Sequence, residues 1–257
     1  MSDLTHAKDA AEAVDAIAAL MRGRRTLAVT GAGISTDAGI PDYRGAGTTP
    51  VEPVDYDQFV TDPVWYRWVW ARNHATWRLL DPLTPTPGHT ALARLEEAGL
   101  VTGVATQNVD RLHSRAGQRT VWELHGNWER LVCTSCGAVA SLGDSVRVDG
   151  DPVPTCPSCA SQMRPDIVMY GESLDQDVIE AAVTAISRAS VLIVAGTSLV
   201  VYPAAGLINY FSGDHLVLMN ATPTSADAHA DLIVREPVAR TFDLVMDKLH
   251  EDGVVSS

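Results

Sequence analysis

The sequence lacks several features that would point to a membrane or a nucleic acid. No hydrophobic run within its 257 residues approaches the length of a membrane span. Basic residues are few, since 19 Lys and Arg stand against 32 Asp and Glu and give a net charge of −13. Nucleic acids and anionic membrane surfaces select clustered Lys and Arg. We therefore predict no direct nucleic-acid partner and no membrane partner.

Residues 1–25 also lack the form of a signal peptide or a transit peptide. Asp3, Asp9, Glu12 and Asp15 interrupt the segment, and no basic region precedes an apolar one. Its apolar residues recur instead at helical spacing, which predicts an amphipathic helix. We predict a cytoplasmic protein, in which the four cysteines need a role other than disulfide formation.

Short apolar runs alternate with helical segments over most of the chain. The predicted strands are 26–31, 101–108, 190–196, 215–220 and 231–235, and the predicted helices are 88–99, 175–187, 203–212 and 238–252. Continuous apolar runs are typical of strands buried on both faces of a parallel sheet. The alternation predicts an α/β fold with a doubly wound parallel sheet. Residues 45–87 and 126–170 break the alternation, and we predict that these insertions build a smaller second lobe.

The first strand is followed by a glycine loop, "GAGIST" at residues 31–36. Glycines there allow the backbone to approach a pyrophosphate, and a following helix N-terminus would supply N–H donors. The fingerprint of hydride-transferring enzymes would place Gly or Ala at position 36, and would end a second strand with an acidic residue. This chain has Thr36 and no such strand, so the loop favours a nucleotide but not hydride transfer.

The cysteines form the pattern C-x₂-C-x₁₉-C-x₂-C, made by Cys133, Cys136, Cys156 and Cys159. This spacing is typical of a structural zinc ribbon. Two thiolates from each turn complete a tetrahedron and leave no open coordination position for catalysis. Two separate reduced thiol pairs, a redox C-x-x-C, or iron in place of zinc are the alternatives.

Polar residues follow several predicted strands at the edge where an open α/β sheet binds ligands. The strand at 101–108 runs into "TQNVDRLH", and a helix N-cap at Asn108 or Asp110 is the alternative to a binding role. His125 comes just before the cysteine segment. Small residues follow the strand at 190–196, and Asn220 ends the strand at 215–220. These segments predict one shared binding site.

Six segments together resemble the sirtuins, which are NAD-dependent protein-lysine deacylases. They are "GAGISTDAGIPDYRG", "TQNVDRLH", "ELHG", the paired C-x-x-C, "RPDIVMYGE" and "GTSLVVYPAAGL". They occur in family order across about residues 27–221. The resemblance implies a Rossmann-type NAD-binding domain of residues 1–44, 88–125 and 171–257. It also implies a cofactor loop and helical insertion at 45–87 and a zinc-ribbon module at 126–170.

The resemblance also assigns residues. It implies NAD as a co-substrate that is consumed and one structural Zn²⁺ on the four cysteines. His125 would be the general base, with Asn108 and Asp110 also in the catalytic group. Substrate contacts would come from Val168, Tyr170 and Gly171. The residues implied to bind NAD are Gly31, Ala32, Gly33, Ile34, Ser35, Thr36, Asp42, Tyr43, Arg44, Gln107, Asn108, Val109, Asp110, His125, Gly196, Thr197, Ser198, Asn220 and Val238.

The implied partners are acylated-lysine proteins or peptides. The acyl oxygen attacks the ribose carbon that carries nicotinamide, and His125 then accepts a proton from a ribose hydroxyl. Nicotinamide leaves in the first step, the activated hydroxyl attacks the acyl carbon in the second, and water then completes the release of free lysine and O-acyl-ADP-ribose. Two alternatives stay open: a protein mono-ADP-ribosyltransferase using the same NAD site, and a non-catalytic NAD-binding or zinc-ribbon interaction module.

The word "WARN" at residues 70–73, followed by Trp77, resembles the class II branch of the family. Desuccinylase-type members carry a Tyr and an Arg where this chain has Trp70 and Asn73. An amide cannot pair with a carboxylate as Arg does, so we predict poor desuccinylation. Helix packing is the simpler interpretation of the tryptophans in this segment, although one of them could line the acyl channel.

Overall fold

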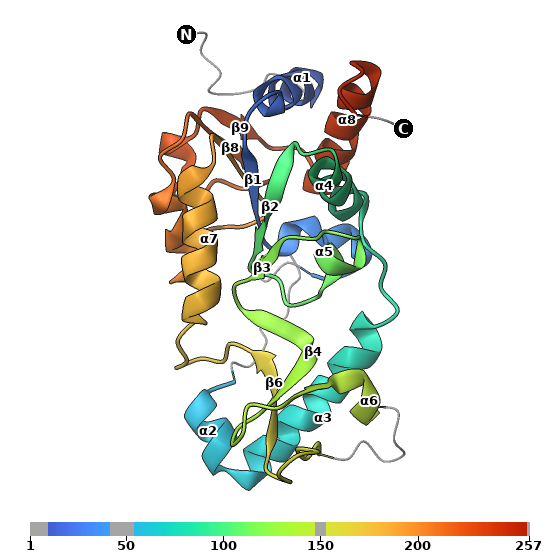
Figure 1. Ribbon diagram of the computed structural model, residues 1–257, viewed down its shortest axis with the longest axis vertical. Coiled ribbons are helices and arrows are strands. Elements are labelled where there is room, and N and C mark those ends of the chain that lie inside the picture. The colour runs from blue at the N-terminus through green and yellow to red at the C-terminus, as the bar shows by residue number, and fades with distance from the viewer. Residues whose placement is uncertain (1–9, 42–53, 147–152, 256–257) are drawn as a thin grey trace.

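A six-stranded parallel sheet forms the centre of the larger lobe in the computed structural model, which describes residues 10–41, 54–146 and 153–255 (Figure 1). Its order is β3-β2-β1-β7-β8-β9. The strands are β1 (Thr26–Thr30), β2 (Val101–Thr106), β3 (Val121–Glu123), β7 (Val191–Ala195), β8 (His215–Met219) and β9 (Leu232–Val234). The predicted doubly wound fold is confirmed. β3 was not predicted, because it is three half-buried residues long and includes a glutamate.

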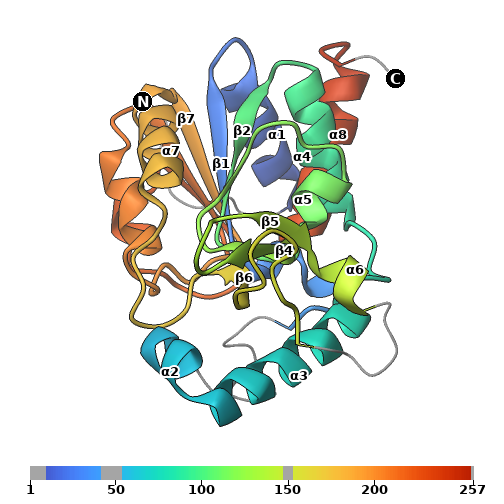
Figure 2. The same cartoon turned by 60° about the horizontal axis from the view of Figure 1, so that its bottom comes forward.

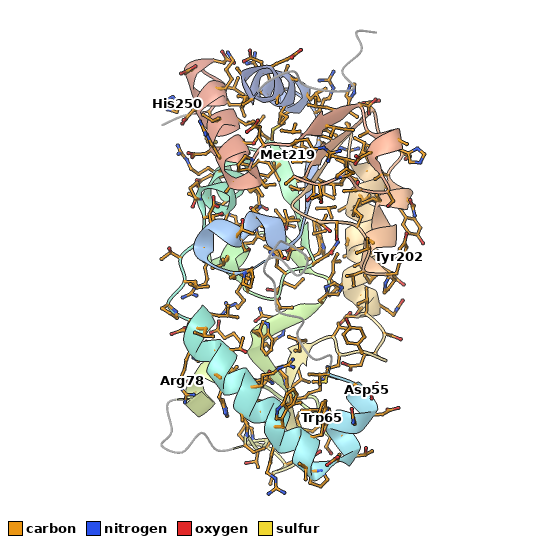
Figure 3. All side chains as sticks on the ribbon, turned by 180° about the vertical axis from the view of Figure 1, so that it is seen from behind. Asp55, Trp65, Arg78, Tyr202, Met219 and His250 are labelled. Carbon is orange, nitrogen blue, oxygen red and sulfur yellow. The ribbon has the colours of Figure 1, made fainter. Side chains whose placement is uncertain are left out.

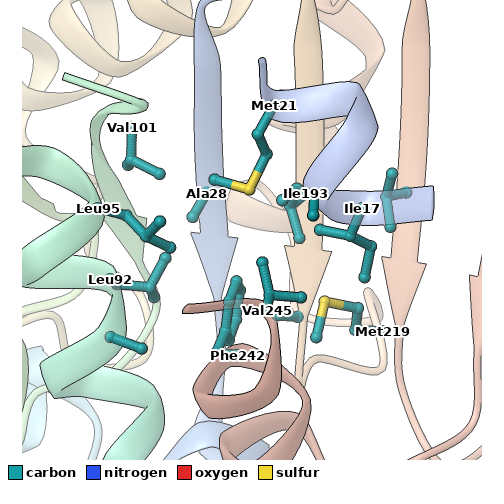
Figure 4. Packing of buried hydrophobic residues seen from close by; sticks show 14 of the residues in the cluster. Ile17, Met21, Ala28, Leu92, Leu95, Val101, Ile193, Met219, Phe242 and Val245 are labelled. Atoms are coloured by element: carbon teal, nitrogen blue, oxygen red, sulfur yellow. The ribbon is translucent and has the colours of Figure 1, made fainter. Parts of the chain in front are cut away.

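Helices cover both faces of this sheet because successive residues along its strands point to opposite sides. Ala28 and Ile193 belong to one core, while Leu27 and Leu192 belong to the other. The first core is completed by α1 (Ala10–Met21), α4 (Pro87–Glu97) and α8 (Val238–Glu251), as Figure 4 shows. The second core is completed by α7 (Gln176–Arg188) and η3 (Ala204–Tyr210).

The predicted helix at 203–212 is a 3₁₀ helix, η3, rather than an α-helix. It is short and contains Gly206, which disfavours helix propagation. The other short helices are η1 (Ala32–Ile34), η2 (Thr36–Ala38), α5 (Leu112–Arg115) and η4 (Asp227–His229). Among the described residues, none of the helices has both the length and the apolar character needed to cross a bilayer.

The two inserted segments build a smaller lobe, as predicted. An antiparallel sheet of order β5-β4-β6 contains β4 (Gly126–Cys133), β5 (Val139–Ser141) and β6 (Met163–Ile167). It packs with α2 (Tyr56–Thr61), α3 (Pro63–Leu80) and α6 (Leu142–Val146), and Figure 2 shows α3 running along the end of the molecule. Phe59, Trp70 and Leu131 are buried in the shared core. The exact division of the chain into domains stays a prediction.

Candidate functional site

The carboxyl ends of the parallel strands lie level with one another. In the registers, Thr30 is opposite both Thr106 and Ala195, and Met219 is opposite both Ala195 and Val234. The loops that leave these strands therefore meet at one edge. The chain order reverses between β1 and β7, which is where a doubly wound sheet opens a ligand-binding crevice.

The glycine loop after β1 packs directly on the loop after β7. A Cβ on Gly31 would lie 2.7 Å from Thr197 Cβ, and one on Gly33 would lie 2.7 Å from Gly196 Cα. The Gly33 amide donates to the Gly196 carbonyl at 2.9 Å. The helix that follows Gly31 is the short 3₁₀ helix η1, which is succeeded by a second 3₁₀ helix, η2. The glycines permit loop–loop contact, a reason that the sequence does not reveal.

Ser35 connects the loop after β1 to the loop after β2. Its side chain is fully buried. The hydroxyl donates to Asp110 Oδ2 at 2.7 Å and accepts from Asn108 Nδ2 at 3.0 Å. Asn108 Nδ2 also donates to the Gly31 carbonyl at 3.2 Å. The predicted residues Ser35, Asn108 and Asp110 thus form one hydrogen-bonded group.

The carboxyl group of Asp110 is both buried and hydrogen-bonded, and these two influences act on its pKa in opposite directions. Burial raises the pKa of its carboxyl group, while hydrogen bonds from Leu112 N, Ser35 and Asn108 oppose that shift. The Leu112 amide, at the first residue of α5, donates to Oδ1 at 2.9 Å, while the N-cap position itself is Arg111. One carboxylate oxygen therefore faces the helix and the other faces Ser35, and the binding role of Asp110 stays a prediction.

Two buried histidines lie behind this group, and the sequence analysis assigned neither of them. His113 Nε2 lies 2.9 Å from Thr30 Oγ1, and His89 Nε2 lies 3.4 Å from Ser35 Oγ. The two rings are in edge contact, with centroids 4.6 Å apart. Burial lowers the pKa of His89 to about 4, and burial together with His89 lowers that of His113 well below 6.5. The sequence carries no local signal for this pair, because His89 and His113 lie far from the glycine loop along the chain and only the fold brings them together.

His125 follows β3 and faces the same edge. Its Nδ1 lies 2.9 Å from the Gln107 carbonyl oxygen, which can only accept. Nδ1 therefore carries the proton, and Nε2 is left as the acceptor in the neutral ring. Burial lowers the pKa of His125, and the Gln107 carbonyl opposes that shift. The ring is accordingly neutral at pH 7 with a basic Nε2, which suits a general base.

Gln107 and the loop after β7 complete the central part of the edge. Thr197 Oγ1 donates to Gln107 Oε1 at 3.3 Å, and Gln107 Nε2 is a buried donor without a hydrogen-bond partner in the described part of the chain. An unpaired buried donor is costly, and binding sites commonly explain one. The Gly196 amide donates to the Met219 carbonyl at 2.8 Å, and Ser198 lies half-buried beside Thr197.

The remaining residues predicted to bind NAD do not belong to one hydrogen-bonded group. Ile34 and Val238 are buried in the apolar core, so their side chains serve packing. Asn220 Nδ2 donates to the Thr222 carbonyl at 2.8 Å. Ala32 is half-buried, Thr36 is exposed, and the Val109 carbonyl accepts from Trp128 N. Asp42, Tyr43 and Arg44 lie outside the described residues.

The predicted substrate residues lie where the two lobes meet. The Val168 amide donates to the His125 carbonyl at 2.9 Å. Tyr170 forms a parallel β-bridge with Asp55, which Figure 3 labels in the smaller lobe. Tyr170 is 70% exposed. Gly171 has φ +87°, a conformation that favours glycine. Segment 168–171 therefore runs from its hydrogen bond with the His125 carbonyl to the protein surface.

The four cysteines cluster as the spacing predicts. Their sulfur atoms all lie within 4.8 Å of one another, with Cys133–Cys159 and Cys136–Cys159 at 3.5 Å and Cys136–Cys156 at 3.6 Å. A tetrahedral zinc ion with Zn–S bonds of about 2.3 Å would hold its sulfurs about 3.8 Å apart. The backbone amides of Ser135, Cys136 and Ser158 point at the buried sulfurs, which favours thiolates. The cluster fits a structural zinc ion.

Comparison with known families decides the relationship. The model of the Sir2 family matches residues 31–203. The chain belongs to the Sir2 family. It is 38% identical over 266 residues to "NAD-dependent protein deacetylase 1" of Mycobacterium avium (strain 104), covering 91% of this chain and 94% of that protein. It is 41% identical over 229 residues to "NAD-dependent protein deacetylase" of Clostridium perfringens (strain 13 / Type A), covering 84% and 91%.

Solved Sir2 structures share the whole architecture of this Sir2-family chain. A complex described as "Sir2-p53 peptide-NAD+" has a TM-score of 0.77 and 39% identity, covering 95% of this chain and 99% of that one. A Sir2 homolog–NAD complex has a TM-score of 0.82 and 33% identity, covering 93% and 94%.

The helix α3 of this Sir2-family chain carries the two residues singled out for the acyl group. Trp70 and Asn73 are each 1% exposed, and both polar atoms of the Asn73 carboxamide lack a partner in the described part of the chain. Trp70 packs edge-on against Tyr66. Of the four tryptophans on α3, Trp70 is therefore a core residue, whereas Trp68 is 37% exposed.

Proposed function

We propose that this chain is an NAD-dependent protein-lysine deacetylase, which yields nicotinamide, free lysine and O-acyl-ADP-ribose. The observation that carries the proposal is the hydrogen bond from His125 Nδ1 to the Gln107 carbonyl. It holds a neutral imidazole with a basic Nε2 at the strand ends of a Sir2-family fold. The names of the relatives agree with this activity.

We assign NAD to the sheet edge formed by the loops after β1, β2 and β7. The carboxamide of the nicotinamide would lie against Val109 and Asp110. The ribose hydroxyls would lie near Gln107, whose buried Nε2 has no partner among the residues that the structure describes. The diphosphate would lie along the loop that contains Ala32, Gly33 and Thr36. The adenosine would lie toward Gly196, Thr197, Ser198, Asn220 and Val238, and Tyr43 and Arg44 would face the ribose and phosphates.

NAD supplies a ribose carbon whose bond to a pyridinium is easily broken. The chain then has two tasks. Asp110, fixed by Ser35, orients the nicotinamide group. His125 Nε2 accepts one proton from a ribose hydroxyl. The acceptor must be unprotonated for this step, and burial favours that state by lowering the pKa of His125.

We place the acyl-lysine peptide along Val168, Tyr170 and Gly171, where a peptide would add as a strand. We also propose a cytoplasmic location. The net charge of −13 argues against a nucleic-acid partner and against an anionic membrane surface. We further assign the chain to the class II branch, on the "WARN" word at residues 70–73 followed by Trp77.

The acyl preference has its own test. Trp70 and Asn73 offer no cation to an acidic acyl group, so succinyl-lysine peptide should be turned over much more slowly than acetyl-lysine peptide. Initial rates on matched acetyl and succinyl peptides measure this. Asn73→Arg should raise the succinyl rate relative to the acetyl rate, and equal rates in the wild type would contradict the assignment.

The proposed activity is tested by incubating the protein with NAD and an acetyl-lysine peptide. We expect nicotinamide, deacetylated peptide and O-acetyl-ADP-ribose by mass spectrometry. His125→Ala should abolish turnover while NAD still binds, and Ser187→Ala, on the exposed face of α7, should leave turnover unchanged. ADP-ribose attached to protein would favour the transferase instead. Absence of nicotinamide release would leave only a binding role.

A further inference from the structure

A two-point ion pair between Arg164 and Glu172 closes the loop that follows β6. Arg164 is the second residue of β6, and Glu172 follows segment 168–171. Within segment 168–171, Met169 is buried and only Tyr170 and Gly171 are exposed. Arg164 Nη1 pairs with Glu172 Oε1, and Nη2 donates to Oε2 at 2.7 Å. The side chains are only 16% and 15% exposed. A forked pair at this burial is geometrically selective and weakly screened by salt.

Both partners of this pair also hold the backbone between them. Arg164 Nη2 donates to the Ile167 carbonyl at 2.7 Å, and the Met169 amide donates to Glu172 Oε2 at 2.8 Å. The Arg164 guanidinium in addition lies 5.1 Å from the ring centroid of Tyr56, at the start of α2. The ion pair therefore fixes segment 167–169 from one side.

The other side of the segment is bonded to both lobes. The Val168 amide donates to the His125 carbonyl at 2.9 Å. The Tyr170 amide donates to the Val54 carbonyl at 2.9 Å, and the Tyr56 amide donates to the Tyr170 carbonyl at 3.0 Å. The successive amides of Val168, Met169 and Tyr170 therefore all donate to protein partners, and the backbone is held in place before any ligand binds.

We propose that the Arg164–Glu172 pair is a positioning device that sets the affinity for the acyl-peptide substrate. The proposal rests on the function above, in which Val168, Tyr170 and Gly171 accept the peptide as an added strand. Adding a strand to a mobile segment would cost the entropy of ordering that segment. The ion pair removes this cost, because it orders the peptide-binding segment before the peptide arrives. Neither residue needs to touch the peptide.

The role is separable from a general contribution to stability. The NAD-facing group of Ser35, Asn108 and Asp110 is bonded through its own hydrogen bonds and not through Arg164 or Glu172. Loss of the ion pair should therefore weaken peptide binding and leave NAD binding intact. A purely structural pair would affect KM for both substrates or neither.

The test compares Arg164→Gln, Glu172→Gln and the double variant with Arg22→Gln as the control. Arg22 also belongs to an ion pair, with Asp252, but it lies between α1 and α8. We expect each single variant to raise KM for an acetyl-lysine peptide about tenfold, equivalent to about 1.4 kcal/mol. KM for NAD should stay within about twofold, and the double variant should resemble the worse single variant. Arg164→Lys should restore only part of the affinity, because an ammonium cannot form the fork.

Fluorescence anisotropy of a labelled acetyl-lysine peptide measures binding separately from turnover. It therefore distinguishes the positioning role of the ion pair from the proposed function. An active wild type whose variants keep the wild-type peptide KM overturns the positioning role and leaves the proposed function standing. A wild type that binds peptide without turnover overturns the proposed function, and the variants' peptide Kd still decides the positioning role. A wild type that neither binds nor converts the peptide overturns both.

Discussion

Replacing Ser35 with alanine tests whether the buried hydroxyl holds Asp110 in the nicotinamide-facing position. The hydroxyl donates to Asp110 Oδ2 at 2.7 Å and accepts from Asn108 Nδ2 at 3.0 Å, and it is fully buried. Alanine leaves a carboxylate oxygen and an amide hydrogen without this partner. A hydrogen bond to a charged group contributes about 1.5–3 kcal/mol.

We expect that loss to appear in kcat/KM for NAD, which should fall by about 10- to 100-fold. The assay is nicotinamide release at saturating acetyl-lysine peptide with NAD varied. Ser35→Cys should lie between serine and alanine, because a thiol is a weaker donor. Ser187→Ala is the matched control, since its hydroxyl bonds only to the Thr184 carbonyl on the exposed face of α7.

The outcome that refutes this reasoning is a Ser35→Ala protein with wild-type kcat/KM for NAD and an unchanged free energy of unfolding. In that case Asp110 would be oriented by the Leu112 amide alone. A fall in stability with an unchanged kcat/KM would assign Ser35 to the fold only.

Two further predictions concern pH and metal. Burial lowers the pKa of His89 to about 4 and that of His113 well below 6.5, so between about pH 4 and 6.5 the unfolded chain binds protons that the native chain does not. The free energy of unfolding should therefore be fully maintained above pH 6.5 and fall as the pH drops toward 4, by up to about 3 kcal/mol from His89 alone. Denaturant titrations across this range measure it, and His89→Gln should show a shallower decline; an identical slope in the variant would contradict the assignment. Chelation of zinc should unfold the sheet of β4, β5 and β6, because structural zinc contributes about 10–16 kcal/mol of binding free energy in zinc-finger peptides. It should also abolish peptide turnover, because β6 runs directly into segment 168–171. Circular dichroism and metal analysis monitor this; Zn²⁺ should restore activity and Mg²⁺ should not, and a metal-free protein that keeps full turnover would show that the ion is dispensable.

The core elements of the fold could be predicted because they have strong local patterns. Strands such as β1 and β7 are continuous apolar runs, and Asp62 with Pro63 marks the start of α3 through an N-cap and a proline at the first turn. β3 escaped prediction because a short edge strand has no such pattern. The sequence also predicted that a helix begins after Gly31, but not that it is a short 3₁₀ helix, because that depends on the contact of the loop with Gly196 and Thr197.

The sequence by itself determined the zinc ligands, the parallel sheet and the segments that meet at its carboxyl edge. These depend on residue spacing, apolar periodicity and chain order, all of which are local. Only the tertiary structure decided that Ser35 joins Asn108 to Asp110, that Gly33 faces Gly196, and that His89 meets His113. Each of these contacts joins residues more than about twenty positions apart, and hydrogen-bond direction and burial arise only when the strands are in register.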